Sequence, residues 1–238
     1  MQLQEQSWTD VRDSDATVAV LPVGSTEQHG PHNPLGVDAI VAREFAQAAC
    51  EGTDIVCLPG VEIGVAEHHR AFDGTLYVSP DTLRDYVAET LRSLTHHGID
   101  RAVVVNGHGG NSAAVEQACA RLTRDGELFA VAWEWFSTRE VDVGHGGEYE
   151  TALMMHLRPE LVGEPVEGDA ETWGQYVGGA SVAHDTDEFT ANGITGDARE
   201  ATPELGEELF EGALADLREL LAWVRTEAPD APRTDAQT

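Results

Sequence analysis

The sequence predicts an α/β fold with a largely parallel central sheet. Short apolar runs rich in β-branched residues alternate along the chain with longer runs of helical periodicity. Two of the apolar runs end in glycine-containing turns that lead into a predicted helix. Strands that alternate with helices in this way build βαβ units, whose strands pair in parallel. A chain of 238 residues suits one domain, which we expect at residues 1–227, followed by a polar tail at 228–238.

The N-terminal half opens with a β-branched run at 17–23, a predicted strand that ends at the turn residues Gly24 and Ser25. An Ala-rich helix is expected at 37–50, and 54–58 is the next strand candidate. Residues 59–77 form a polar segment with three glycines, a length of irregular chain that is commonly functional.

The C-terminal half continues the alternation. Ser79 and Pro80 are a cap and a first-turn proline, so a helix begins there and runs to His97, before Gly98. The further predicted elements are a strand at 101–105, a helix to about 124, a strand at 128–135, a helix at 145–157 and an amphipathic helix at 203–227.

The composition is strongly acidic, with a formal net charge of -29 and arginine as the only basic residue besides histidine. Such a chain repels nucleic acid phosphates and anionic membranes, so we expect neither as a partner. Salt screening at molar concentration would relieve the self-repulsion, which suggests a halophilic source. With no apolar run near the roughly 20 residues of a membrane span and three cysteines in apolar segments, we expect a reducing, cytoplasmic location.

A first cluster of potential metal ligands follows the strand at 17–23. Glu27, His29 and Asp38 lie within twelve residues of one another, at the carboxyl end of a strand, where α/β proteins usually bind small ligands. A carboxylate such as Asp38 can bridge two cations. The alternative is an ordinary polar loop, with Asp38 as a helix cap.

A second cluster, residues 106–111, follows the strand at 101–105. Parallel strands end at the same edge of a sheet, so His108 should meet the first cluster as a fourth ligand. Gly109, Gly110 and Asn111 open the next helix, where backbone N–H groups could bind an oxyanion or phosphate of the substrate.

Several segments together resemble the creatininase family of amidohydrolases, in the family's order and over roughly residues 17–225. The matching segments are Pro22–His32, Gly36–Asp38, Phe72–Thr75, Asn106–Asn111, His145–Thr151 and Gly193–Ala201. The resemblance implies a three-layer α/β/α fold, a homo-oligomer that is usually a hexamer, and hydrolysis of an amide C–N bond of a small molecule with two divalent metals.

The resemblance also implies a ligand set and a catalytic residue. Glu27, Asp38 and His108 would hold one metal, while His29 and Asp38 would hold the other. His145 falls on the family's histidine for proton transfer or for polarising the scissile group. Two carboxylates and two imidazoles suit Fe²⁺, Zn²⁺ or Mn²⁺.

The sequence departs from creatininase itself directly after His108. Creatininase has a Tyr and a metal-binding Glu there, whereas this chain has Gly109 and Gly110. Creatinine is therefore not the expected substrate, and the second metal needs another ligand, for which we choose Glu150. Glu148 lies two residues earlier on the same helix and points elsewhere; for both, the alternative is a favourable charge in the first helical turn.

The expected reaction is the deformylation of a formamidopyrimidine ribonucleotide monophosphate, a step of flavin and deazaflavin synthesis. This expectation rests on the family resemblance together with the Gly-His-Gly-Gly-Asn turn. Arg70 or the turn at Gly109 and Gly110 would bind its phosphate. The alternatives are a peptidase that trims a modified peptide during redox cofactor maturation, a hydrolase of cyclic amides such as creatinine, and a non-catalytic assembly protein that keeps metals only for folding.

Overall fold

The computed structural model describes residues 1–138 and 143–229. Its central sheet has the strand order β2-β1-β3-β4, and all neighbouring strands are parallel. The strands are β1 (Val18–Val23), β2 (Val56–Cys57), β3 (Arg101–Asn106) and β4 (Phe129–Glu134). The predicted strands are all present, although β2 is shorter than the expected 54–58 run. The parallel α/β fold is therefore confirmed.

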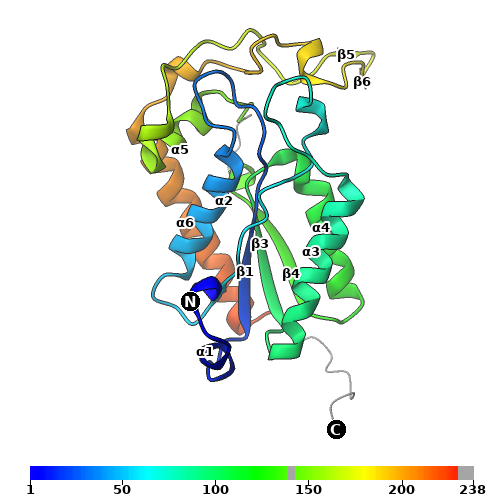
Figure 1. Ribbon diagram of the computed structural model, residues 1–238, viewed down its shortest axis with the longest axis vertical. Coiled ribbons are helices and arrows are strands. Elements are labelled where there is room, and N and C mark those ends of the chain that lie inside the picture. Colours follow the sequence, from blue (N-terminus) through cyan, green and yellow to red (C-terminus); the bar gives the residue numbers. More distant parts are fainter. Residues whose placement is uncertain (139–142, 230–238) are drawn as a thin grey trace.

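Helices cover both faces of this sheet, as Figure 1 shows. Val18 and Val20 of β1 face a core formed with α2 (Val37–Cys50), α5 (Glu148–Leu157) and α6 (Pro203–Thr226). Ala19 and Leu21 point to the opposite face and pack with α3 (Pro80–Leu94) and α4 (Ser112–Arg124). This alternation gives each face of the sheet its own apolar core, which is the expected three-layer α/β/α arrangement.

Local signals set the helix limits. The Ser79 hydroxyl accepts a hydrogen bond from the Thr82 N–H at the start of α3, and Gly98 takes a left-handed φ of 79° after the last turn. The helix predicted from residue 145 begins later, at Glu148. Gly144 and Gly146 have φ values of +68° and +62°, which are incompatible with helix.

Two glycines bring α2 against the carboxyl ends of β1 and β3. A Cβ on Gly24 would lie 2.4 Å from the Ala39 nitrogen, and one on Gly107 would lie 2.3 Å from the Asp38 carbonyl oxygen. Because Val23 and Asn106 are direct neighbours in the sheet, both turns meet the first turn of α2 at the same edge. The absence of side chains at 24 and 107 therefore allows Asp38 to sit between the two strand ends.

The remaining part of the chain between α5 and α6 is irregular. It contains short 3-10 turns and a hairpin of β5 (Tyr176–Val177) and β6 (Ala180–Ser181), which lies at one end of the molecule in Figure 1. Among residues 1–138 and 143–229, none of the helices combines the length and the apolar composition that a membrane span requires.

The expected tail at 228–238 lies outside the described residues from 230 onward. Ala228, its first residue, is instead buried in the core beside α6. Trp133 and Trp135 are also buried in the core on the α6 side of the sheet, and the three cysteines are buried free thiols.

Candidate metal centre

The four residues predicted as metal ligands meet at the carboxyl edge of the sheet. Glu27 and His29 come from the β1–α2 loop, Asp38 from the first turn of α2, and His108 from the turn after β3. His29 Nε2 lies 3.1 Å from Asp38 Oδ1, His108 Nε2 lies 3.2 Å from Glu27 Oε2, and His108 Nδ1 lies 3.3 Å from Asp38 Oδ2. All four side chains are buried.

Two further predicted residues approach this cluster from the loop and first turn of α5. Glu150 Oε2 lies 3.7 Å from His29 Nε2 and accepts a hydrogen bond from the Gly146 N–H at 2.6 Å. His145 Nδ1 lies 3.9 Å from Glu27 Oε1. Of the two glutamates at the start of α5, Glu150 is therefore the one whose side chain reaches the other candidate ligands.

The donor atoms form overlapping groups that share a carboxylate. Glu27, Asp38 and His108 make one group, and His29, Asp38 and Glu150 make another, each with ligand atoms within 4.8 Å of one another. Asp38 belongs to both groups, with Oδ2 facing His108 and Oδ1 facing His29. This arrangement suits a carboxylate that bridges two cations. A third group consists of Glu27, His29 and His145.

The chemistry of the donor set fits divalent cations. Both carboxylate oxygens of Glu27 and Oδ2 of Asp38 are buried and have no hydrogen-bond partner. A buried carboxylate oxygen without a partner is strongly destabilising, and a bound cation would remove this cost. Oxygen and imidazole nitrogen donors together suit Mn²⁺, Fe²⁺ or Zn²⁺.

Backbone carbonyls fix the orientation of the three imidazoles. His29 Nδ1 lies 3.2 Å from the Glu27 carbonyl, His108 Nε2 lies 3.0 Å from the Val65 carbonyl, and His145 Nε2 lies 2.7 Å from the Gln28 carbonyl. A carbonyl oxygen only accepts, so each of these ring nitrogens carries the proton. The other nitrogen of each ring then presents a lone pair to the cluster, which is how metal-binding histidines are usually held.

The electrostatics of the metal-free cluster reflect its surplus of carboxylates. Burial disfavours the charged form of His108, but the charge of Glu27 and the contact with Asp38 outweigh it and raise the pKa to about 9. Burial likewise opposes the charging of His29, and Asp38 with Glu150 raise its pKa well above the usual range. In contrast, burial and the neighbouring imidazoles lower the pKa of His145 to about 3. Without cations, protons on His29 and His108 balance the carboxylates.

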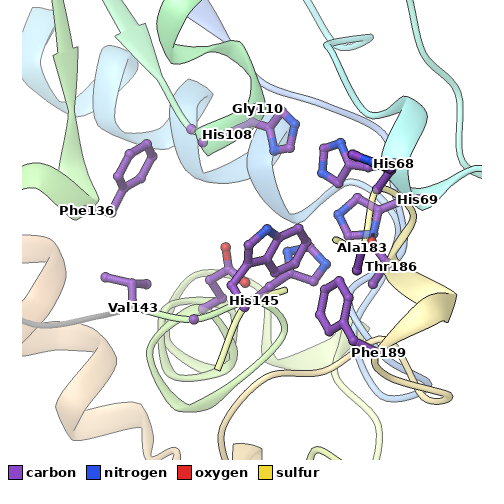
Figure 2. Close-up of a pocket in the computed structure, with 16 residues that line it drawn as sticks. His68, His69, His108, Gly110, Phe136, Val143, His145, Ala183, Thr186 and Phe189 are labelled. Atoms are coloured by element: carbon purple, nitrogen blue, oxygen red, sulfur yellow. Dashed lines mark hydrogen bonds between the residues drawn. The ribbon is translucent and has the colours of Figure 1, made fainter. Parts of the chain in front are cut away.

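The candidate centre lies at the base of a cavity of about 630 Å³. Figure 2 shows His68, His69, His108 and His145 grouped around this space, with Phe136 and Val143 on one side and Phe189 on the other. Trp173 also lines it and packs edge-on against Phe189 and His145. The covering residues come from the irregular segment between α5 and α6.

The structure brings only part of the predicted substrate-binding set to this cavity. Gly109 and Gly110 line it, and a Cβ on Gly110 would lie 2.4 Å from His108 Nε2. Asn111 does not; its buried amide instead donates to the Gly24 carbonyl and accepts from the Val65 N–H, which ties two loops together. Arg70 also lies outside the lining, half-exposed and paired with Asp185 at 2.6 Å.

From the sequence, His69 is only a candidate for substrate contact in the long segment at 59–77, and Gln28 has no role, although both are buried in the centre. His69 Nε2 lies 3.2 Å from Glu27 Oε1, and the Gln28 amide nitrogen lies 2.9 Å from His69 Nδ1. The available signal was position, because Gln28 separates two predicted ligands and His69 lies in the long irregular segment at 59–77. The covering residues Trp173 and Phe189 have no motif that marks them.

Comparison with known proteins places these observations in a family. Residues 4–221 match the creatininase family, described as creatinine amidohydrolase. A mycofactocin precursor peptide peptidase from Mycolicibacterium smegmatis is 33% identical over 206 residues, which cover 81% of this chain and 79% of that protein. A 2-amino-5-formylamino-6-ribosylaminopyrimidin-4(3H)-one 5'-monophosphate deformylase from Methanothermobacter marburgensis is 30% identical over 160 residues, or 62% and 67% of the two chains.

Solved creatininase structures agree in fold. The structure "Creatininase Mn" has a TM-score of 0.77 and 25% identity, and the match covers 96% of this chain and 99% of that one. A mutant creatininase of the Zn-Zn type has a TM-score of 0.78 at 25% identity. The chain therefore belongs to the creatininase family, whose members are metal-dependent amidohydrolases acting on C–N bonds.

Proposed function

We propose that this protein hydrolyses a C–N bond with two divalent cations held by Glu27, His29, Asp38, His108 and Glu150. The observation that carries the proposal is the sharing of Asp38 by two groups of buried donor atoms, together with the unpartnered oxygens of Glu27 and Asp38. A purely structural metal site is usually closed by four protein ligands, whereas each group here offers three and opens onto a cavity. This contrast favours an enzyme over a metal-stabilised assembly protein.

Bound cations would polarise the scissile carbonyl and lower the pKa of a bound water. Glu27, Asp38 and Glu150 supply the negative charge that such cations require. The Nε2 of His145 is committed to the Gln28 carbonyl, and its Nδ1 faces Glu27 at 3.9 Å. We therefore assign proton transfer to Nδ1 of His145, which accepts a proton from the attacking water and passes that proton to the leaving amine.

For the substrate we propose a peptide rather than the phosphorylated formamide. Beside its histidines, the cavity is lined by the aromatic side chains of Trp173, Phe189 and Phe136, which suit the side chain of a peptide residue. Among the described residues that line the cavity there is no arginine to bind a phosphate. The similarity to the mycofactocin precursor peptide peptidase also covers more of the chain than the similarity to the deformylase.

One observation favours the deformylase as the second candidate. Gly109 and Gly110 line the cavity at the start of α4, and α4 has no side chain capping its first turn. Free backbone N–H groups at a helix N-terminus can bind a phosphate without an arginine. The deformylation of a formamidopyrimidine nucleotide is therefore kept as the alternative substrate chemistry.

A product assay separates these reactions. The full-length protein is loaded with Mn²⁺, Zn²⁺ or Fe²⁺ and offered short peptides with an apolar C-terminal residue, the formamidopyrimidine nucleotide, and creatinine. We expect release of a new amine from a peptide, with no formate from the nucleotide. Formate release from the nucleotide alone would transfer the assignment to deformylation. Tight metal binding without turnover of any substrate would favour the assembly role instead.

The oligomeric state is a separate proposal. We propose a homo-oligomer, with the hexamer that the family resemblance implies as the specific expectation. Light scattering coupled to gel filtration measures the mass directly, and a monomer of 25.6 kDa would contradict it.

A further inference from the structure

His69 has a fixed place beside the candidate metal centre that none of the roles above uses. Its ring is fully buried in the 3-10 turn Glu67–His69, and Nε2 lies 3.2 Å from Glu27 Oε1. The His145 ring stacks on it, with centroids 4.4 Å apart and an interplanar angle of 24°. The ring of His69 is therefore held with one edge against a carboxylate of the group formed by Glu27, Asp38 and His108.

The hydrogen-bond partners of His69 determine which ring nitrogen carries the proton. Nδ1 lies 2.9 Å from Gln28 Nε2 and 3.0 Å from Thr186 Oγ1. The orientation of the Gln28 amide is fixed, because its oxygen accepts from the Gly30 N–H and its nitrogen donates to the Gly193 carbonyl, both at 2.9 Å. The Gln28 amide nitrogen also lies 2.9 Å from His145 Nε2, but that nitrogen is already the donor to the Gln28 carbonyl. The second hydrogen of the Gln28 amide is therefore left for Nδ1 of His69, which must accept.

Because Nδ1 accepts, the proton of a neutral His69 lies on Nε2, the nitrogen that faces Glu27. Glu27 Oε2 faces His108, at 3.2 Å from Nε2 of that ring. The Nε2–H group of His69 lies beside Oε1 without the alignment of a hydrogen bond, and its attraction to that oxygen would keep Oε2 turned towards His108 and Asp38. Residues that orient a metal ligand in this way commonly affect metal affinity by about 10- to 100-fold.

We propose that His69 is a positioning residue that restrains Glu27 through the 3.2 Å contact of its protonated Nε2 with Oε1, with its tautomer set by Gln28 and Thr186. The proposal rests on the metal centre of the proposed function. Thr186 belongs to the segment that also carries Trp173 and Phe189 into the cavity wall. The cover of the cavity is thereby connected through Thr186 and His69 to a metal ligand.

The test compares metal binding in single variants of the full-length protein after removal of metal by a chelator. The probes are Mn²⁺ alone, whose dissociation constants are measured by calorimetry, and Co²⁺ alone, whose visible absorption reports the geometry of its ligands. The variants are His69→Phe, which keeps a packed ring but removes both nitrogens, Thr186→Val, which removes the hydroxyl at nearly constant shape, and Thr186→Ser, which restores it. Asp185→Asn is the matched control, because it breaks the neighbouring exposed ion pair with Arg70 and leaves the Thr186 hydroxyl in place.

We expect His69→Phe to weaken binding at one cation site by about 10- to 100-fold and to change the Co²⁺ spectrum. Thr186→Val should cause a smaller change of the same kind, Thr186→Ser should reverse it, and Asp185→Asn should bind both ions like the unmodified protein. Wild-type affinity and spectrum in both His69→Phe and Thr186→Val would overturn the positioning role. If His69→Phe does not fold, Thr186→Val decides alone. An unmodified protein that binds neither ion would overturn the proposed function as well, which separates the two failures.

Discussion

The two walls of the cavity are built differently. On one wall, His108 follows β3 and lies 3.2 Å from the buried Glu27 of the turn after β1 and 3.3 Å from the buried Asp38 of α2. On the other wall, Trp173 and Phe189 come from an irregular segment whose only strands are two residues each. Tyr176 and Val177, at the hairpin of that segment, are exposed.

This difference suggests that the two walls have different functions. Donor atoms must be held within a fraction of an ångström, and turns fixed by a packed sheet provide that precision. A wall made of a segment with few buried apolar residues can change its shape and sequence without disturbing the sheet. We call the wall with His108 the scaffold wall and the wall with Trp173 and Phe189 the covering wall. We expect the rate of the chemical step to depend on the scaffold wall and the choice of substrate to depend on the covering wall.

The largest expected effect comes from a ligand on the scaffold wall. His108→Ala removes a donor from the group with Glu27 and Asp38, so activity should fall by more than about 100-fold, and the metal content should drop. Elemental analysis of the purified variant and a single-turnover assay measure the two quantities. Unchanged metal content and turnover would remove His108 from the site and contradict the role given to the scaffold wall.

A matched pair on α5 tests how far the scaffold wall extends. Glu150→Gln should reduce activity by about 10- to 100-fold and weaken one cation, because Glu150 faces His29. Glu148→Gln, two residues earlier on the same helix, lies in none of the groups of candidate ligands and should change neither property. Equal effects of the two substitutions on metal affinity would show that Glu150 acts only through the charge of the first helical turn.

A substitution in the covering wall should produce a different pattern. Trp173→Ala removes an aromatic ring from the cavity, so we expect KM for the substrate to rise by about 10-fold, or ~1.4 kcal/mol, with metal content unchanged. Steady-state kinetics and elemental analysis on the same preparation provide the measurement. Loss of metal in this variant would contradict the separation of the two walls.

The smallest effect concerns pH and the metal-free protein. The pKa of His108 in the folded metal-free state is about 9, above the ordinary unfolded value of about 6.5. Its contribution to stability is thus fully present below about pH 6.5 and is lost as pH rises through 9. The melting temperature of the metal-free protein should fall over this range, by about 2–4 °C for each kcal/mol lost. The metal-loaded protein, whose imidazoles are already deprotonated, should show a smaller fall; parallel curves would argue against cations at His108.

The sequence by itself determined the alternation of strands and helices, the parallel sheet, and the edge at which Glu27, Asp38 and His108 meet. Hydrophobic periodicity and glycine turns are local signals, and the ends of parallel strands converge by geometry. The helix limits at Ser79 and Gly98 followed for the same reason. The acidic composition led to the inference of a halophilic source, which stays a prediction.

Only the tertiary structure decided which polar residues reach the centre. Glu150 rather than Glu148 faces the cluster, where its Oε2 accepts from the Gly146 N–H and lies 3.7 Å from His29 Nε2. Asn111 and Arg70 were expected at the substrate, but their side chains are used to tie loops together, through hydrogen bonds and an ion pair that sequence spacing does not reveal. These contacts join residues far apart in the chain, and such pairings are set by how the segments between the strands fold back over the sheet.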